Sequence, residues 1–183
     1  MFDTNFFSVV RVVQAFTPLL MRSADARIVN MSSLSSLVPI PTMSMYASAK
    51  AALNIFGDTL RVELAPLGIQ VTTILAGTVQ NSRDHSDVSV IMAPDSPYLP
   101  VKDAFVGVVS KAADGRMPGQ AFAQIVVSQI LRKRPAAKVW AGSCSLLVWL
   151  LGLFVPTWLL DLICARMYGL HKLAGVRGSR KTV

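Results

Sequence analysis

The stretch ARIVNMSSLSSLVPIPTMSMYASAKAALNIFGDTLRVELAPLGIQVTTIL (residues 26–75) decides the fold of this 183-residue chain. The runs 26–33 and 69–75 are short and rich in β-branched residues, which is typical of buried parallel strands. Between them, alanines and other helix-forming residues predict a long helix that begins near 42–44 and is closed by Pro66 and Gly68. A strand, a helix and a second strand in this order predict an α/β sheet with parallel strands.

The rest of the chain extends this pattern on both sides. Apolar residues recur at helical spacing over 5–22. After the second strand, residues 77–100 form a long polar loop, and such loops are usually either functional lids or unstructured. Helical patterns return over 101–113 and 118–134, and the run 137–142 (AKVWAG) predicts a final edge strand.

The composition narrows the class of protein. Apolar residues make up 52% of the chain, charged residues 15%, and the mean hydropathy is +0.50, which indicates a large core, a partner surface or a membrane segment. The net charge is +8, and the basic residues gather near the C-terminal apolar stretch without any nucleic-acid-binding pattern. We therefore expect membrane lipid, and no nucleic acid, as a partner. Cys144 and Cys164 show no metal-ligand spacing and are expected to be reduced thiols.

Three residues form the constellation with the clearest chemistry. Ser33 ends the first strand, Tyr46 follows thirteen residues later, and Lys50 lies four residues beyond Tyr46. Residues four apart share a helix face, so the ammonium of Lys50 can lie near the phenol. A phenol has a pKa of roughly 10, and a nearby cation stabilises its phenolate form. Because open α/β sheets bind ligands at the carboxyl ends of their strands, the Ser33 hydroxyl is placed to bind a substrate carbonyl.

These segments resemble a known family. IVNMSSLSSLVPIPTMSMYASAKAAL (28–53) and DTNFF (3–7) resemble the active-site segments of short-chain dehydrogenases/reductases, and the resemblance covers about residues 3–82. It implies the C-terminal half of a Rossmann-type, doubly wound parallel sheet. It also implies an oxidoreductase that interconverts a carbonyl and an alcohol with NADP, or alternatively with NAD.

The resemblance assigns roles to four catalytic residues. Tyr46 is expected to be the general acid that protonates the alkoxide during carbonyl reduction. Lys50 is expected to assist that proton transfer and to bind the nicotinamide ribose, so both residues also belong to the cofactor site. Ser33 is expected to orient the substrate, and Asn5 to support a water and proton relay. Asn5 can also serve as a helix N-cap.

The resemblance extends to three further cofactor positions. Arg11 matches a basic position that often binds the cofactor, although an ordinary solvated charge is an alternative. In LAGTVQNS (75–82), Val79 is expected to offer backbone contacts to the nicotinamide, and Asn81 stands where a threonine is usual. Ala76 replaces a typical proline, which predicts a less rigid turn.

The family's front half has no counterpart in this sequence. The glycine-rich TGxxxGxG turn that cradles the cofactor pyrophosphate does not occur, nor does the usual Asn-Asn-Ala-Gly strand. We therefore expect a truncated product, or an incomplete gene product, of a longer reductase. Such a chain should bind the cofactor poorly and should leave a strand edge and apolar faces exposed.

The C-terminal third carries the apolar stretch. From Val139 to Leu160 no charged residue occurs, and about twenty such residues suffice to cross a bilayer. Basic residues flank both sides, which favours membrane attachment, spanning or within one leaflet. The alternative is a substrate-pocket helix or an oligomer contact. The expected organisation is a catalytic half (1–138), a hydrophobic helical membrane segment (139–165) and a basic tail (166–183).

The strand AKVWAG followed by a hydrophobic segment resembles fungal acyl-dihydroxyacetone-phosphate reductases and reductases of secondary metabolism. This implies a hydrophobic, lipid-like ketone or alcohol as substrate, and a place on the cytosolic face of the endoplasmic reticulum or on lipid droplets. The family commonly dimerises through its long helices, so a homo-oligomer is expected. The alternatives are a non-catalytic membrane-bound reductase remnant or interaction partner, and a small membrane adaptor.

Overall fold

The computed structural model describes residues 1–80 and 92–173, and its centre is one sheet of three parallel strands in the order β1-β2-β3. The strands are β1 (Ala26–Ser33), β2 (Ile69–Ala76) and β3 (Lys138–Ala141). Ala26 of β1 pairs with Ile69 of β2, and Thr73 of β2 pairs with Lys138 of β3. The parallel α/β sheet and all three strands confirm the prediction.

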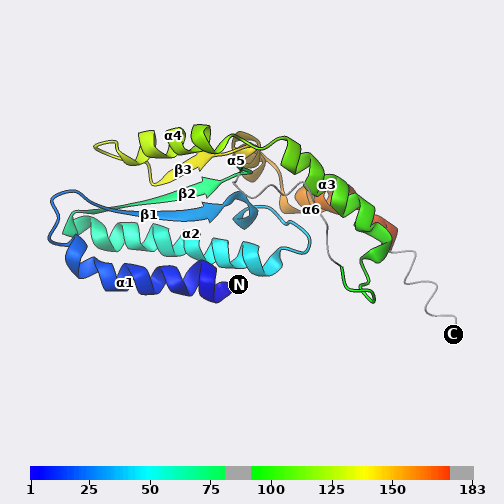
Figure 1. Cartoon of the computed structure of the whole chain (residues 1–183), viewed down its shortest axis with the longest axis horizontal. Coiled ribbons are helices and arrows are strands. Elements are labelled where there is room, and N and C mark those ends of the chain that lie inside the picture. Colours follow the sequence, from blue (N-terminus) through cyan, green and yellow to red (C-terminus); the bar gives the residue numbers. More distant parts are fainter. Residues whose placement is uncertain (81–91, 174–183) are drawn as a thin grey trace.

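Helices cover both faces of the sheet (Figure 1). On one face lie α1 (Ser8–Leu20), which continues a π-helical turn at Asp3–Phe7, and α2 (Ser44–Leu64), which continues into a 3-10 turn. On the other face lies α4 (Gly119–Ile130). Each face has its own apolar core, because β-branched and leucine side chains alternate between the two sides of the strands. The first core is formed by Val13, Ala26, Ile28, Leu60, Leu64, Ile69 and Val71, and the second by Ile74, Val126, Val139 and Ala141.

Three helices gather beyond the carboxyl ends of the strands (Figure 1). They are α3 (Lys102–Asp114), α5 (Ser145–Phe154) and α6 (Thr157–Met167). Short 3-10 turns lie at Leu34–Ser36, Leu99–Val101 and Leu170–Lys172. Phe105 of α3 packs edge-on against Tyr168 at the end of α6, with the ring centres 4.8 Å apart, and this contact joins the two helices.

The outer strand β1 has a single neighbour, β2, among the described residues. On the β1 face that points away from α2, Val29 and Met31 are 40% and 45% exposed, although both are large and apolar. An exposed apolar strand at a sheet edge is a site for pairing with further chain. The exposed edge and apolar face were predicted from the sequence.

The uncharged stretch from Val139 to Leu160 is not one helix. Its first residues belong to β3 and are buried in the sheet, Gly142 turns the chain with a φ of +94°, and Pro156 separates α5 from α6. In the described part of the chain, no helix is both long enough and apolar enough to cross a bilayer. The stretch therefore forms a strand and two short helices, divided by a turn and a proline, and the membrane attachment expected for 139–165, spanning or within one leaflet, stays a prediction.

The expected basic tail also begins later than 166. Arg166 and Met167 end α6, and Leu170–Lys172 forms a 3-10 turn that follows the buried Tyr168. Residues 174–183 lie outside the described residues. On the other side of the apolar stretch, Lys138 is paired with Asp58 at 2.8 Å, so it is a fold contact and not a flanking charge free for lipid.

Candidate active site

Ser33 lies where β1 ends and the chain turns into the 3-10 turn Leu34–Ser36. Its Oγ accepts hydrogen bonds from the backbone N of Ser35 at 3.2 Å and from the Ser35 hydroxyl at 2.9 Å. Both bonds use the oxygen as acceptor, so the proton of the Ser33 hydroxyl is left to donate to a ligand. The predicted position of Ser33, at the carboxyl end of a strand, is observed.

A buried amide holds the backbone behind Ser33. Asn54 of α2 donates from Nδ2 to the Ser36 hydroxyl at 2.8 Å, and Ser36 donates to the Ser33 carbonyl oxygen at 2.5 Å. Asn54 is 8% exposed, so this chain of bonds is shielded from water and fixes the Ser33 turn against α2. Sequence reasoning missed Asn54, which is one of many polar residues on a helix and carries no motif.

Tyr46 and Lys50 lie one turn apart near the start of α2, as their spacing predicts. The Lys50 Nζ lies 5.7 Å from the centre of the Tyr46 ring and donates a hydrogen bond to the Met31 carbonyl oxygen at 2.9 Å. Burial lowers the pKa of Lys50 below its ordinary value. Among the described residues, no carboxylate lies within ion-pair distance of Lys50, so its charge is not neutralised locally.

Ser33 and Tyr46 share one cavity of about 410 Å³, a volume within the usual range for small-molecule sites. Elements that follow all three strands contribute to its walls. The lining is mostly apolar and consists of Ser33, Leu34, Ser35, Val38, Ile40, Met43, Tyr46, Ala76, Gly77, Thr78, Val108, Val109, Ala112, Ser143, Cys144, Val148 and Tyr168. Two hydroxyls that can bind a carbonyl oxygen therefore face an apolar space.

Comparison with known proteins agrees with this geometry. A profile described as short chain dehydrogenase matches residues 1–89. The short-chain dehydrogenase srdE of Neurospora crassa is 35% identical over 94% of this chain and 59% of its own length. The short-chain dehydrogenase RED1 of Pyricularia oryzae is 32% identical over 97% of this chain and 63% of its own length. The chain belongs to the short-chain dehydrogenase family.

Solved structures show the same fold. A short-chain dehydrogenase from Streptomyces avermitilis has a TM-score of 0.65 at 20% identity, over 98% of this chain and 62% of its own length. A short chain dehydrogenase from Burkholderia cenocepacia, in complex with NADP, has a TM-score of 0.57 at 21% identity, over 89% of this chain and 56% of its own. The chain thus spans 59% and 63% of the two curated relatives described above.

The other two residues that the family resemblance singled out near the N-terminus lie apart from the cavity lining. Asn5 lies inside the π-helical turn, so it is not the N-cap, and its side-chain amide donates to the Met1 carbonyl oxygen at 3.0 Å. Arg11 forms a surface ion pair with Asp3 at 3.0 Å, and its side chain is 59% exposed. Their roles in a proton relay and in cofactor binding stay predictions.

The segment after β2 is held firmly, although Ala76 replaces the proline usual in short-chain dehydrogenases. Gly77 donates its N–H to the Ala141 carbonyl oxygen at 2.7 Å, and Val79 forms a β-bridge with Met117. A Cβ on Gly77 would lie 2.0 Å from the Ser143 carbonyl oxygen, so only glycine allows this close contact of the two chains. Thr78 and Ser143 also pair, whereas Asn81 lies outside the described residues.

Tyr168 is a cavity residue that sequence reasoning missed. It is 8% exposed, and burial, followed by the nearby Cys164 thiol, raises its pKa above the ordinary value. Its hydroxyl therefore keeps its proton at neutral pH and stays a hydrogen-bond donor. Cys144 and Cys164 are free thiols, as predicted. No group of residues suited to hold a metal ion occurs in the described ranges.

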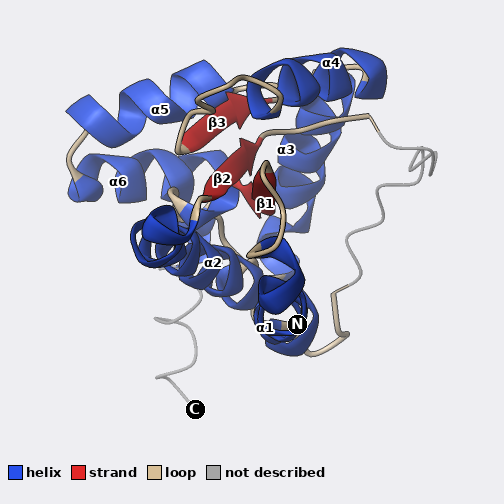
Figure 2. Cartoon of the chain, turned by 90° about the vertical axis from the view of Figure 1, so that its left-hand side faces the viewer, coloured by secondary structure: helices blue, strands red, loops and turns tan. Residues whose placement is uncertain are grey.

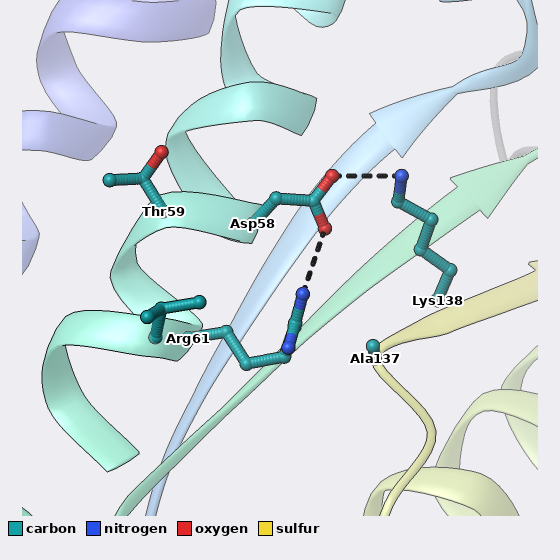
Figure 3. Close-up of a pocket in the computed structure, with 6 residues that line it drawn as sticks. Asp58, Thr59, Arg61, Ala137 and Lys138 are labelled. Carbon is teal, nitrogen blue, oxygen red and sulfur yellow. Dashed lines mark ion pairs between the residues drawn. The ribbon is translucent and has the colours of Figure 1, made fainter. Parts of the chain in front are cut away.

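A larger hollow, of about 640 Å³, lies between α2 and the start of β3 (Figure 3). Asp58 pairs there with Lys138 at 2.8 Å and with Arg61 at 3.7 Å. One carboxylate is shared here by two cations, and Ser33, Tyr46 and Lys50 lie elsewhere. We therefore assign the active site to the smaller cavity, because its reactive hydroxyls match the family and size alone does not indicate chemistry.

Proposed function

We propose that the chain carries the catalytic half of an NADP-dependent oxidoreductase that interconverts a ketone and an alcohol. The observation that carries this proposal is the shared cavity of Ser33 and Tyr46, with the Lys50 ammonium 5.7 Å from the tyrosine ring. In this proposal, both hydroxyls donate hydrogen bonds to the substrate carbonyl oxygen. Tyr46 then gives its proton to that oxygen as negative charge develops there, and the Lys50 cation stabilises the phenolate left behind.

The residues present suit the nicotinamide end of the cofactor. Lys50 has three ammonium protons and uses one on the Met31 carbonyl oxygen, which leaves two for the hydroxyls of a ribose. The backbone of 76–79 is the expected contact for the nicotinamide itself. When bound, this group supplies the hydride. We propose NADP over NAD, in line with the NADP complex of the Burkholderia cenocepacia short chain dehydrogenase.

The pyrophosphate end has no such partner in the given sequence, which contains no glycine-rich TGxxxGxG turn. We propose that this chain alone binds NADPH weakly. Titration of the chain with NADPH, followed by cofactor fluorescence, tests this point, and tight binding would contradict it. The alternative of a non-catalytic remnant is not favoured, because Ser33 and Tyr46 share a cavity and Lys50 lies beside the Tyr46 ring.

The substrate we propose is a hydrophobic, lipid-like or secondary-metabolite ketone, or the corresponding alcohol. The support is the lining of the cavity, where Leu34, Val38 and Val148 face the space beside the two hydroxyls. Apolar walls bind by removing apolar surface from water, and the few polar groups fix the orientation of the carbonyl.

The cellular setting is also a proposal. We propose attachment to the cytosolic face of the endoplasmic reticulum or to lipid droplets, supported by the uncharged stretch from Val139 to Leu160. We further propose a homo-oligomer. Its support is a set of large apolar side chains exposed on α1 and α2, which includes Val12, Phe16, Ile55 and Val62.

The reaction is tested with a joined protein, in which the nucleotide-binding half of the srdE relative precedes Met1. We expect NADPH oxidation with long-chain ketones, and a fall of about a hundredfold to ten-thousandfold in kcat/KM when Tyr46→Phe removes the proton donor. Tyr98→Phe, which changes an exposed tyrosine outside the cavity lining, is the matched control and should leave the rate unchanged. Undiminished reduction by the Tyr46→Phe protein would refute the proposed role.

A further inference from the structure

The helices α5 and α6 form a hairpin that projects away from the sheet. Both run outward on the same side, and the loop at Val155–Pro156 joins them at the far end (Figure 2). Large apolar side chains are exposed along both helices, and those beside the loop are the most exposed, with Phe154 at 76% and Trp158 at 67%. The other members of this surface are Leu146, Leu147, Trp149, Leu150, Leu153, Leu162, Ile163 and Met167.

Charge is absent from the tip of the hairpin and present at its base. The first charged residue after the loop is Asp161, which is exposed on α6, and Arg166, His171 and Lys172 follow near the base. Asp161 lies four positions after Thr157, which places its backbone roughly 6 Å along the helix axis from the tip. Interfacial helices bury their apolar parts about 5–10 Å deep, so the uncharged tip has the length that such insertion needs.

We propose that the α5–α6 hairpin inserts tip first into one leaflet of a membrane. The apolar side chains at the loop enter the acyl region, and Arg166 and Lys172 meet anionic headgroups at the base. The net charge of +8 favours association of the chain with an anionic surface.

A lipid surface fits the hairpin better than a second protein chain does. Protein interfaces have an apolar centre with a polar rim around it. On the hairpin, the exposed apolar side chains continue to the tip, where Phe154 and Trp158 are the most exposed, and the charged groups lie toward the base. This arrangement is typical of an interfacial anchor, and it gives a protein partner no polar rim at the tip.

Insertion of the hairpin would hold the cavity close to the membrane surface. Cys144 and Val148 at the start of α5 and Tyr168 after α6 line the cavity, so the base of the hairpin is part of its wall. A ten-residue helix is about 15 Å long, which keeps the cavity within one hairpin length of the acyl region. Resting here on the proposed function, we infer that the substrate is a ketone dissolved in the membrane and not one taken from water.

Flotation of the full chain with phosphatidylcholine vesicles, with and without phosphatidylserine, tests the insertion. We expect binding that phosphatidylserine strengthens, and a fall of at least about tenfold in the partition coefficient for the Phe154→Asp, Trp158→Asp double variant. The matched control is Val127→Asp, Leu131→Asp at the end of α4, where the exposed fractions are 47% and 68%. It should bind as the unchanged chain does, and circular dichroism verifies that each variant is folded.

A second measurement reports depth. In a chain with Trp140→Phe and Trp149→Phe, Trp158 is the remaining tryptophan, and lipids brominated on the upper acyl chain should quench it more strongly than lipids brominated near the chain end. Absence of vesicle binding, equal losses in the tip and α4 variants, or self-association that only the tip variants abolish would each overturn the proposal. Vesicle binding with no ketone reduction by the joined protein would retain the anchor and reject the proposed function.

Discussion

Two lysines, Lys50 on α2 and Lys138 paired with a residue of α2, differ in how their charge is used. Lys138, at the start of β3, is neutralised by Asp58 at 2.8 Å, and the same carboxylate also meets Arg61 (Figure 3). Lys50 lies beside the Tyr46 ring and has only the Met31 carbonyl oxygen as its hydrogen-bond acceptor among the described residues.

The presence or absence of a carboxylate partner distinguishes a structural lysine, Lys138, from a reactive one, Lys50. A lysine paired with a carboxylate joins two elements, and its field is cancelled at short range. A half-buried lysine without a carboxylate makes the folded state less stable, but no carboxylate cancels its charge beside the neighbouring phenol. The comparison predicts that replacing Lys50 mainly affects activity, whereas replacing Lys138 mainly affects stability.

The largest expected effect comes from removing each cation in turn. In the joined protein, Lys50→Met should lower kcat/KM by about a hundredfold, because the phenolate of Tyr46 loses its stabilising charge. Lys138→Met should leave kcat/KM within about twofold, since that lysine lies outside the catalytic cavity. Equal losses in the two variants would show that the Lys50 charge has no special role.

Ser33→Ala should have the next largest effect. Loss of one hydrogen bond to a developing oxyanion costs about a hundredfold to a thousandfold in kcat, and a fall at the lower end of this range is expected in this polar turn. Ser48→Ala, at an exposed position on α2, is the matched control. A change in KM alone would indicate that Ser33 binds the substrate without favouring the transition state.

The pH dependence of stability should distinguish Lys50 as well. Because burial lowers its pKa in the folded chain, the unfolded chain binds more protons between that lowered pKa and the ordinary lysine value of roughly 10.4. The free energy of unfolding should therefore rise with pH in this window and be flat below it. Urea denaturation at a series of pH values should show a smaller rise for Lys50→Met than for the unchanged chain.

The smallest effect is expected at the paired cluster. Asp58→Asn should lower the free energy of unfolding by about 1 kcal/mol or less, because the Asp58, Arg61 and Lys138 side chains are 27%, 42% and 40% exposed and water screens the pairs. Catalysis in the joined protein should not change. A loss of activity without a loss of stability would give this cluster a role that its geometry does not suggest.

The sequence predicted the parts of the fold that depend on neighbouring residues. The strands at 26–33 and 69–76, the long helix and the Ser33, Tyr46 and Lys50 constellation follow from local periodicity and spacing, and the observed bounds agree closely. Periodicity holds because a strand or helix buries one face, and that requirement is visible in a short window of sequence.

The path of the C-terminal apolar stretch could not be predicted in this way. A hydropathy profile measures how favourably residues transfer out of water, and it depends on residue types alone. Its value is therefore the same whether the stretch forms one long helix or a strand followed by two short helices. The division depends on Gly142, which adopts a positive φ beside Gly77, and on Pro156. The cavity walls from α3 and Tyr168 were missed for a related reason, because residues distant in sequence meet there only after folding.

The contact of Gly77 with Gly142 has a mechanical consequence. The amides of Gly77 and Ser143 donate to Ala141 and Thr78 across this contact, at 2.7 Å and 3.2 Å, so the floor of the cavity and the root of the hairpin share the same hydrogen bonds. Neither side can open for amide exchange without breaking the other's bonds. Binding of the hairpin to a bilayer should therefore slow hydrogen exchange at the Gly77 amide. Exchange at this single amide would then report, from the wall of the cavity, that the hairpin contacts lipid.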